Sequence, residues 1–173
     1  TRVFAVRACA AWVCLAFAGQ SIANPNGPSV ISGQAGFQTR GNTLTVTNSP
    51  GAIIQWQGFS IGRDEVTRFL QQSSVSAVLN RVTGGNPSDI LGRLSSNGRV
   101  YLINPSGITF GAGAVIDVAG LVASTLNLSN ADFLAGRHRF DQQPRAVRKV
   151  AGHEHAGRGG RERGLVHLRP SRP

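Results

Sequence analysis

The feature that most constrains this chain is the density of its turn signals. Between Val30 and Leu128, apolar or alternating runs of three to six residues are separated almost everywhere by Gly, Asn, Ser or Pro. Within Thr43–Thr47, Leu44 and Val46 share one face while the threonines take the other, as in a half-buried strand. No stretch of a dozen residues has a convincing helical period. The pattern therefore predicts an all-β chain.

The expected strands are Thr43–Thr47, Ala52–Trp56, Phe59–Ile61, Val66–Leu70, Ala77–Val82, Arg99–Ile103, Ile108–Phe110, Val115–Val118 and Leu121–Ser124. A β-sandwich usually has somewhat longer strands, with a turn signal about every 8–12 residues. Denser turns favour a solenoid, in which coils of roughly 20 residues bury their apolar side chains by stacking on one another. No fixed-length repeat is visible, so the prediction of a solenoid rests on the density of the turns and not on a periodicity.

The segment Tyr101–Gly111 (YLINPSGITFG) shows one such corner in detail. Pro105 sets φ near −65° at the second position of a type I turn. The side chain of Asn104 can accept a hydrogen bond from the backbone two residues on, and Gly107 leaves the turn at no steric cost. Apolar side chains on both sides, ending at Ile108 and Phe110, would each contribute about 1.5–3 kcal/mol when buried. We interpret this turn as structural.

The net charge of +10 lies at the two ends of the chain. Residues 137–173 carry +7 and residues 1–23 carry +2, which leaves +1 for residues 24–136. Arg158, Arg161 and Arg163 lie between glycines, as in RNA-binding arginine–glycine segments, but no aromatic residue alternates with them. This composition predicts salt-sensitive, non-specific attraction to polyanions and no specific nucleic-acid partner.

The N-terminal segment has the layout of a signal peptide. Arg2 and Arg7 precede the apolar run Ala8–Ala18, and Ser21–Ala23 offers small residues for cleavage. Eleven apolar residues are too few for a transmembrane anchor, which needs about 20. The alternative is a buried N-terminal helix. Both cysteines of the chain lie in this segment, so the expected mature protein contains no disulfide.

Residues 24–136 contain neither His nor Cys, which removes the most common general bases and nucleophiles. Asp64 and Glu65 are adjacent, so a strand would point them to opposite faces. His153, Glu154 and His155 have no further metal ligands in a suitable frame around them. We therefore expect no enzyme activity, no metal site and no cofactor.

Several segments between about residues 28 and 140 carry recognisable motifs in a fixed order: Ile54–Gly62, Leu79–Gly84, Pro87–Gly92, Asn97–Gly111, Gly120–Leu126 and Asp132–Gly136. The first five resemble, in the same order, the motifs NWxSFxIG, LNRVTG, PSxIxG, NPNGI and GLxASTL, and the sixth continues the match. These motifs are those of the secretion domains of two-partner-secretion (TPS) exoproteins, which form the N-terminal part of filamentous haemagglutinin-like proteins, so the sequence is similar to that family.

This resemblance implies a right-handed parallel β-helix, a single-stranded solenoid, with flanking short β elements. It also implies export to the periplasm and recognition there by an outer-membrane β-barrel transporter that carries POTRA domains. The protein would then be secreted or held at the surface of a Gram-negative cell. Adhesion or haemagglutination, through a host-cell surface or glycan, would belong to a rod downstream of this domain.

The residues carried over from the family, as positions for transporter recognition or for the fold, are Asn80, Arg81, Asn104, Pro105, Ser106, Gly107 and Ile108. Ser106 stands where the family commonly has asparagine. Asn24–Gly27 (NPNG) also looks like the signature, but we take this second match to be coincidental because it lies beside the expected cleavage site.

The sequence thus divides into a signal peptide (1–23), a TPS β-helix domain (24–140) and a basic, disordered tail (141–173). After Phe140 the strand pattern stops and the composition changes abruptly, which indicates either a frameshifted end or a natural basic tail. Two other functions remain open at this point. The chain could act directly as an adhesin or glycan-binding surface, or it could be a non-functional truncated remnant.

Overall fold

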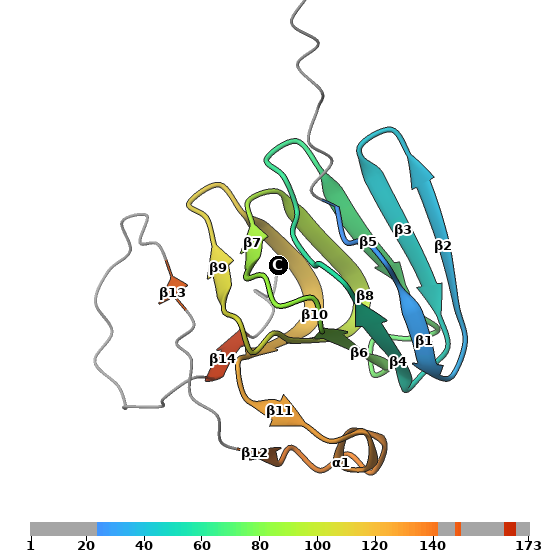
Figure 1. Ribbon diagram of the computed structural model, residues 1–173. Coiled ribbons are helices and arrows are strands. Elements are labelled where there is room, and N and C mark those ends of the chain that lie inside the picture. The colour runs from blue at the N-terminus through green and yellow to red at the C-terminus, as the bar shows by residue number, and fades with distance from the viewer. Residues whose placement is uncertain (1–23, 142–147, 150–164, 169–173) are drawn as a thin grey trace, which may run out of the picture.

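The computed structural model describes residues 24–141, 148–149 and 165–168 (Figure 1). In chain order its elements are β1 (Ser29–Ser32), β2 (Ala35–Arg40), β3 (Thr43–Asn48), β4 (Ala52–Trp56), β5 (Val66–Leu70), β6 (Ala77–Val82), β7 (Ser88–Ile90), β8 (Arg93–Ile103), β9 (Ile108–Phe110), β10 (Val115–Ser124), β11 (Asn127–Leu128), α1 (Asn130–Leu134), β12 (Phe140–Asp141), β13 (Arg148–Lys149) and β14 (Leu165–Leu168).

The strands from β3 to β10 wind into a right-handed parallel β-helix, which confirms the predicted fold class. The first sheet contains β3, β5 and the first halves of β8 and β10. The second sheet contains β4, β6 and the second halves of β8 and β10. The third sheet contains β7, β9 and β13. The chain thus passes through the sheets in turn, once per coil.

The coils differ in length, which explains why no fixed repeat is visible in the sequence. Thr43, Val66, Arg93 and Val115 stack in one column of the first sheet, spaced by 23, 27 and 22 residues. The extra residues lie in the corners, and the strands keep their register apart from one shift between β8 and β10, just after Val118. Stacking is therefore specified strand by strand and not by a repeated motif.

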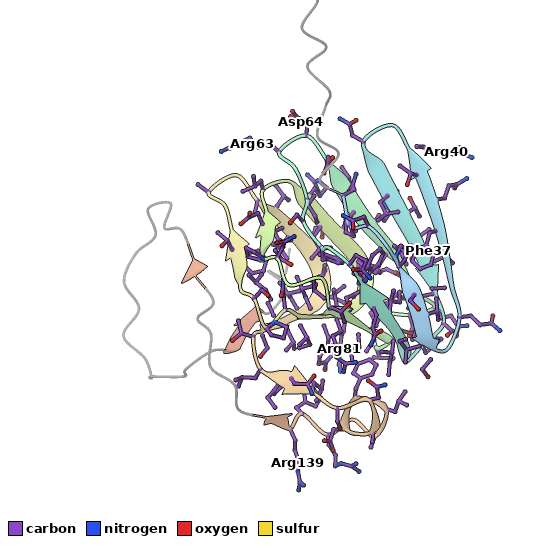
Figure 2. All side chains as sticks on the ribbon, viewed as in Figure 1. Phe37, Arg40, Arg63, Asp64, Arg81 and Arg139 are labelled. Carbon is purple, nitrogen blue, oxygen red and sulfur yellow. The ribbon has the colours of Figure 1, made fainter. Side chains whose placement is uncertain are left out.

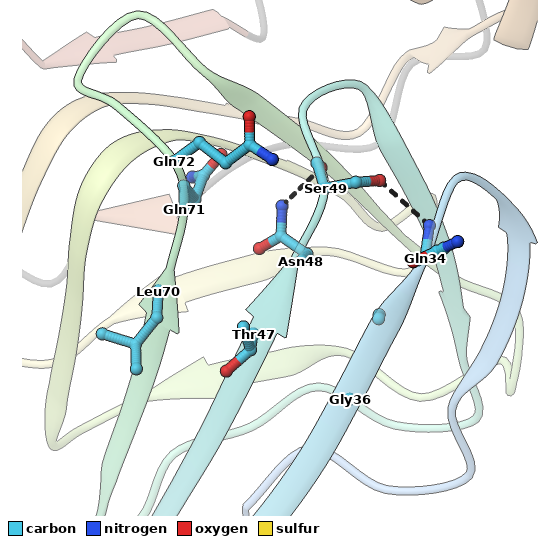
Figure 3. Close-up of a pocket in the computed structure, with 9 residues that line it drawn as sticks. Gln34, Gly36, Thr47, Asn48, Ser49, Leu70, Gln71 and Gln72 are labelled. Carbon is cyan, nitrogen blue, oxygen red and sulfur yellow. Dashed lines mark hydrogen bonds between the residues drawn. The ribbon is translucent and has the colours of Figure 1, made fainter.

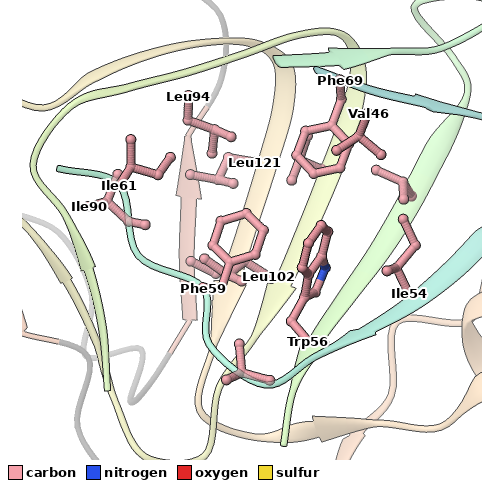
Figure 4. Close-up of a cluster of buried hydrophobic side chains, with 14 of the residues drawn as sticks. Val46, Ile54, Trp56, Phe59, Ile61, Phe69, Ile90, Leu94, Leu102 and Leu121 are labelled. Atoms are coloured by element: carbon pink, nitrogen blue, oxygen red, sulfur yellow. The ribbon is translucent and has the colours of Figure 1, made fainter. Parts of the chain in front are cut away.

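The inward side chains form the main core of the solenoid (Figure 4). An aromatic row lies at its N-terminal end, where the ring of Trp56 forms a T-shaped pair with each of Phe37 and Phe59, the ring centroids being 5.6 Å apart in both pairs. Phe59 stacks on Phe69 at 6.5 Å. The largest fully buried members are Trp56, Phe59, Phe69, Ile54, Ile61, Ile90, Leu94, Leu102 and Ile108.

The second sheet is covered on its outer face as well. There Ile53, Leu79, Tyr101, Ile103 and Val122 form a second cluster with Leu128 and Phe133 of the segment 127–141, which contains β11, α1 and β12. The ring of Phe133 meets that of Tyr101 at 5.2 Å. Because both faces are buried, β4 and the end of β8 read as continuous apolar runs and do not alternate.

Helix α1 has only five residues and begins at a side-chain cap. The hydroxyl oxygen of Ser129 accepts a hydrogen bond from the amide of Asp132 at 3.1 Å and donates to its carboxylate at 2.8 Å. The guanidinium of Arg137 donates to the same carboxylate at 2.7 Å, and these bonds lower the pKa of Asp132. A helix this short shows no periodicity, so the sequence pattern did not predict it.

Antiparallel strands close the two ends of the parallel stack. At the N-terminal end β1 pairs with β4 and β2 pairs with β3. At the other end β14 pairs with Leu121–Ser124 of β10. The predicted flanking β elements are therefore present, and at the N-terminal end they cover the aromatic row through Phe37.

Most of the expected strands are found where the sequence placed them. β4, β5, β6 and β9 have the predicted bounds, and β3 is one residue longer. Two predicted strands at 115–118 and 121–124 are one strand, β10, and the first half of β8 was missed. The prediction of a strand at Phe59–Ile61 is wrong, since only Ile61 forms an isolated bridge, to Ile90.

The predicted signal peptide, 1–23, lies outside the described residues, as does most of the predicted disordered tail, 141–173. Within that tail, β13 and β14 are described as strands. No helix of the described part is long and apolar enough to cross a bilayer.

Candidate functional site

The corner between β8 and β9 has the local geometry that its residues predict. The amide of Gly107 donates to the carbonyl of Asn104 at 3.1 Å and closes the turn. The amide of Ser106 donates to the side-chain oxygen of Asn104 at 2.9 Å, which is the expected Asx-type bond. Gly107 has a φ of +117°, a value that favours glycine. Pro105 is exposed, and Ser106 and Gly107 are half-buried.

Asn104 also links this corner to the coils on either side. Its side-chain nitrogen donates to the carbonyl of Asn86 and to the hydroxyl of Ser88, both at 2.9 Å. Its own amide donates to the carbonyl of Ser124 at 3.0 Å. The side chain is 1% exposed. Asn104 therefore satisfies buried polar groups of three successive coils, while the apolar Ile108 directly after the turn anchors the corner in the core.

Asn80 lies inside the solenoid, in a column with Ile54 and Leu102. Its side-chain oxygen accepts a hydrogen bond from the indole nitrogen of Trp56 at 2.9 Å. Its side-chain nitrogen donates to the carbonyl of Tyr101 at 3.3 Å. A buried indole N–H needs such an acceptor, so the pair is a specific polar contact beside the apolar side chains of the core.

Arg81 points to the opposite side of the same strand (Figure 2). There it holds the segment 127–141, which covers the second sheet and is called the covering segment below. Its guanidinium donates to the carbonyl of Leu128 at 2.5 Å and to the side-chain oxygen of Asn130 at 2.9 Å. Its Nε is buried and has no partner. Burial lowers the pKa of Arg81. The arginine therefore joins β6 to the start of α1.

The structure brings these residues into neighbouring coils but points them in different directions. Arg81 pairs in register with Ile103, the residue before the corner. Asn80 faces the interior, Arg81 faces the covering segment, and the turn Asn104–Gly107 lies at the next corner. They do not converge on one cavity, so the described geometry offers no shared catalytic centre.

Other polar residues of the interior were not singled out from the sequence. Asn24, 5% exposed, accepts a hydrogen bond from the buried hydroxyl of Thr67 at 3.1 Å and donates to the carbonyl of Asn42 at 3.2 Å. Asn26 pairs with Gly58. The NPNG segment that we took for a coincidental match is thus built into the fold. The sequence does contain one signal for such buried polar contacts: a polar residue, such as Thr67, at an inward position of an alternating strand.

In the part of the chain that the structure describes, no three His, Cys, Asp or Glu side chains are grouped so as to hold a metal ion. His153, Glu154 and His155 lie outside the described residues. The expectation that the chain has no metal or cofactor stays a prediction.

Comparison with known proteins places the chain in a family. The TPS secretion domain family matches residues 20–161, past residue 140 where the strand pattern led us to end the domain. Two heme/hemopexin-binding proteins of Haemophilus influenzae are 46% identical over 105 residues and 37% identical over 107 residues, respectively. These matches cover 60% and 61% of this chain but 12% of each relative, so the chain spans about an eighth of their length.

A solved structure agrees with this assignment. The crystal structure of the HMW1 secretion domain from Haemophilus influenzae is 45% identical in sequence and superposes with a TM-score of 0.64. The match covers 65% of this chain and 30% of that one. The TPS secretion domain family is not an enzyme family. Because the family match covers most of the chain and the fold agrees, this chain belongs to the TPS secretion domain family.

Proposed function

We propose that this chain is the N-terminal secretion domain of a filamentous haemagglutinin-like exoprotein, recognised in the periplasm by a cognate outer-membrane transporter with POTRA domains. The family match over residues 20–161 is the observation that carries the proposal. The 45% identity to a solved secretion domain supports the same role. Export by this route delivers the protein outside a Gram-negative cell or to its surface.

The named residues divide between two roles in this proposal. Asn80 and Asn104 are almost fully buried and hydrogen-bonded on both side-chain atoms, so they act on the fold. Arg81 acts on the covering segment. Pro105 and Ser106 are accessible at the corner and offer a surface that a transporter can contact. We assign transporter recognition to the accessible corner and fold maintenance to the buried asparagines.

We do not assign to this chain the heme or hemopexin binding for which the two full-length relatives are named. The two relatives are named for heme and hemopexin, but the shared segment covers 12% of each of them. The family match spans residues 20–161, so most of any segment of 105 residues in this chain lies within it. We therefore propose that this chain has the export role in common with them and that heme or hemopexin binding belongs to regions beyond the shared segment.

The export role is tested by co-expressing the chain with its cognate transporter and measuring the secreted and periplasmic fractions. Ser106→Arg should block secretion with little change in the melting temperature of the purified chain, because the side chain is only half-buried at the corner. Ser74→Arg is the matched control, since Ser74 is exposed on the loop between β5 and β6. Normal secretion of Ser106→Arg would refute the assignment of the corner. Periplasmic retention of the wild-type chain would refute the export role itself.

A further inference from the structure

An open groove of about 550 Å³ crosses the ends of β2, β3 and β5 (Figure 3). It lies where the first sheet turns towards the second. Its lining consists of Gln34, Ala35, Gly36, Thr47, Asn48, Ser49, Leu70, Gln71 and Gln72. Most of these side chains are neutral amides or hydroxyls, and none carries a charge. The family motifs described above do not include any of them.

Two amide side chains of the groove have unused hydrogen-bond acceptors. Asn48 is 5% exposed and Gln71 is 7% exposed. Asn48 uses its nitrogen on the carbonyl of Ser49, and Gln71 uses its nitrogen on Ser96 and on the carbonyl of Arg99. The side-chain oxygens of both residues are buried without a partner. An unpaired buried acceptor costs about 1–3 kcal/mol, so an occupant that supplies donors is favoured at this place.

The same groove has an apolar strip beside its polar groups. Gly36, Thr47 and Leu70 lie in register on the outward face of three neighbouring strands. Leu70 is 44% exposed, and a Cβ built on Gly36 would meet no atom within 4 Å. Amide and hydroxyl side chains beside a small apolar surface suit a pyranose ring. The C–H face of such a ring can pack on the apolar surface, while its hydroxyls both donate and accept hydrogen bonds.

Unpaired positive charge lies on the same face. Arg68 is two residues before Leu70 on β5, which places it about 7 Å along the strand on the outward side. Arg40 also lies on this face, at the end of β2 (Figure 2). Neither side chain forms a hydrogen bond or an ion pair with any residue that the structure describes. An acidic group bound next to the groove would meet Arg68 first.

We propose that this groove binds an acidic oligosaccharide. Sugar hydroxyls donate to the side-chain oxygens of Asn48 and Gln71 through bridging waters, because both oxygens lie below the surface and both amide nitrogens are held by hydrogen bonds of their own. The ring packs on Leu70, and a carboxylate or sulfate group of the neighbouring sugar pairs with Arg68. This binding is independent of export and is a property of the folded domain.

The proposal is tested by calorimetric titration of the purified full chain at about 150 mM salt, where distant charges are screened. The probes are a heparin hexasaccharide, a hyaluronan hexasaccharide and, as the neutral sugar, maltohexaose. We expect both acidic sugars to bind and maltohexaose to bind about tenfold more weakly or less. A preference for heparin assigns the contact to sulfate and equal affinity assigns it to carboxylate, and either result supports the proposal.

Variants separate the groove from the basic ends of the chain, which also attract polyanions. Gly36→Trp should lower the affinity for both acidic sugars about tenfold or more, because an indole at this position occupies the groove and its Cβ meets no atom within 4 Å. Gly36→Ala should leave it unchanged. Arg68→Gln should weaken binding about three- to fivefold, as expected for an accessible ion pair, and Arg63→Gln should not.

Three results would overturn the proposal: equal binding by Gly36→Trp and wild type, equal affinity for maltohexaose and the acidic sugars, or no binding of any probe. Each is read on purified protein without a transporter. Failure here would therefore leave the export role unaffected, and failure of the secretion assay would leave the groove unaffected.

Discussion

At the scale of single residues, Asn104 shows how one side chain can join three coils. It closes its own turn, donates to Asn86 and Ser88 of the coil before, and its amide reaches Ser124 of the coil after. Pro105 beside it is exposed and makes none of these bonds. Two adjacent residues of one sequence motif therefore have different physical roles.

We predict that Asn104→Ala destabilises the domain by about 1–3 kcal/mol, because the hydroxyl of Ser88 and the carbonyl of Asn86 lose a buried donor. The measurement is urea unfolding of the purified chain followed by circular dichroism. Pro105→Ala is the neighbouring control and should cost about 1 kcal/mol or less, through the unfolded state only. Equal losses for the two variants would show that the turn, and not the asparagine side chain, carries the stability.

At the scale of elements, the segment 127–141 decides which faces of the second sheet are buried. It contributes Leu128 and Phe133 to the outer cluster, and Arg81 bonds to Leu128 and Asn130 at its start. Without this segment, Ile53, Leu79 and Tyr101 would form an exposed apolar patch. The arginine is thus a positioning residue for the covering segment.

We predict that Arg81→Met loosens residues 127–141 while the coils keep their structure, because methionine retains the apolar stem but cannot donate to Leu128 or Asn130. Hydrogen exchange measured by mass spectrometry should show faster exchange for α1 and β11 and unchanged exchange for β5. Arg99→Met is the matched control, since Arg99 is exposed and makes no side-chain bond among the described residues. Unchanged exchange in α1 would mean that the apolar contacts of Phe133 hold the segment alone.

At the scale of the whole molecule, stability comes from the stacking of coils around one continuous core. Each coil alone has no partner for its inward side chains, and the antiparallel strands at the two ends cover what the stack leaves open. Leu102 is fully buried in the middle of this core, whereas Leu70 is exposed on the outer face. Loss of a central side chain therefore weakens the contacts of several coils together.

We predict that Leu102→Ala lowers the free energy of unfolding by about 2–5 kcal/mol, through lost burial and the cavity left behind. Circular dichroism and tryptophan fluorescence, to which the buried Trp56 contributes, should report the same shifted transition, because both depend on the same stack. The matched control is Leu70→Ala, which should change the free energy of unfolding by about 0.5 kcal/mol or less in this exposed position. Separate transitions for the two probes would argue against a cooperative stack.

The sequence alone determined what depends on neighbours along the chain. Alternation along Thr43–Thr47, the dense turn signals and the Asx-type turn at Asn104 are local properties, so the strands and that corner could be predicted before any contact was known. The order of the family motifs added the predictions of a β-helix and of an export role. The strand and turn predictions use residues only a few positions apart.

Only the tertiary structure decided what depends on residues far apart in the chain. Trp56 and Asn80 are 24 residues apart and Arg81 and Asn130 are 49 apart, yet each pair shares a hydrogen bond. The buried Asn24, the double-sided burial of the second sheet and the groove between β2, β3 and β5 arise in the same way. A side chain's environment is set by the coil that stacks on it, and coils of unequal length leave no periodic signal from which to predict that contact.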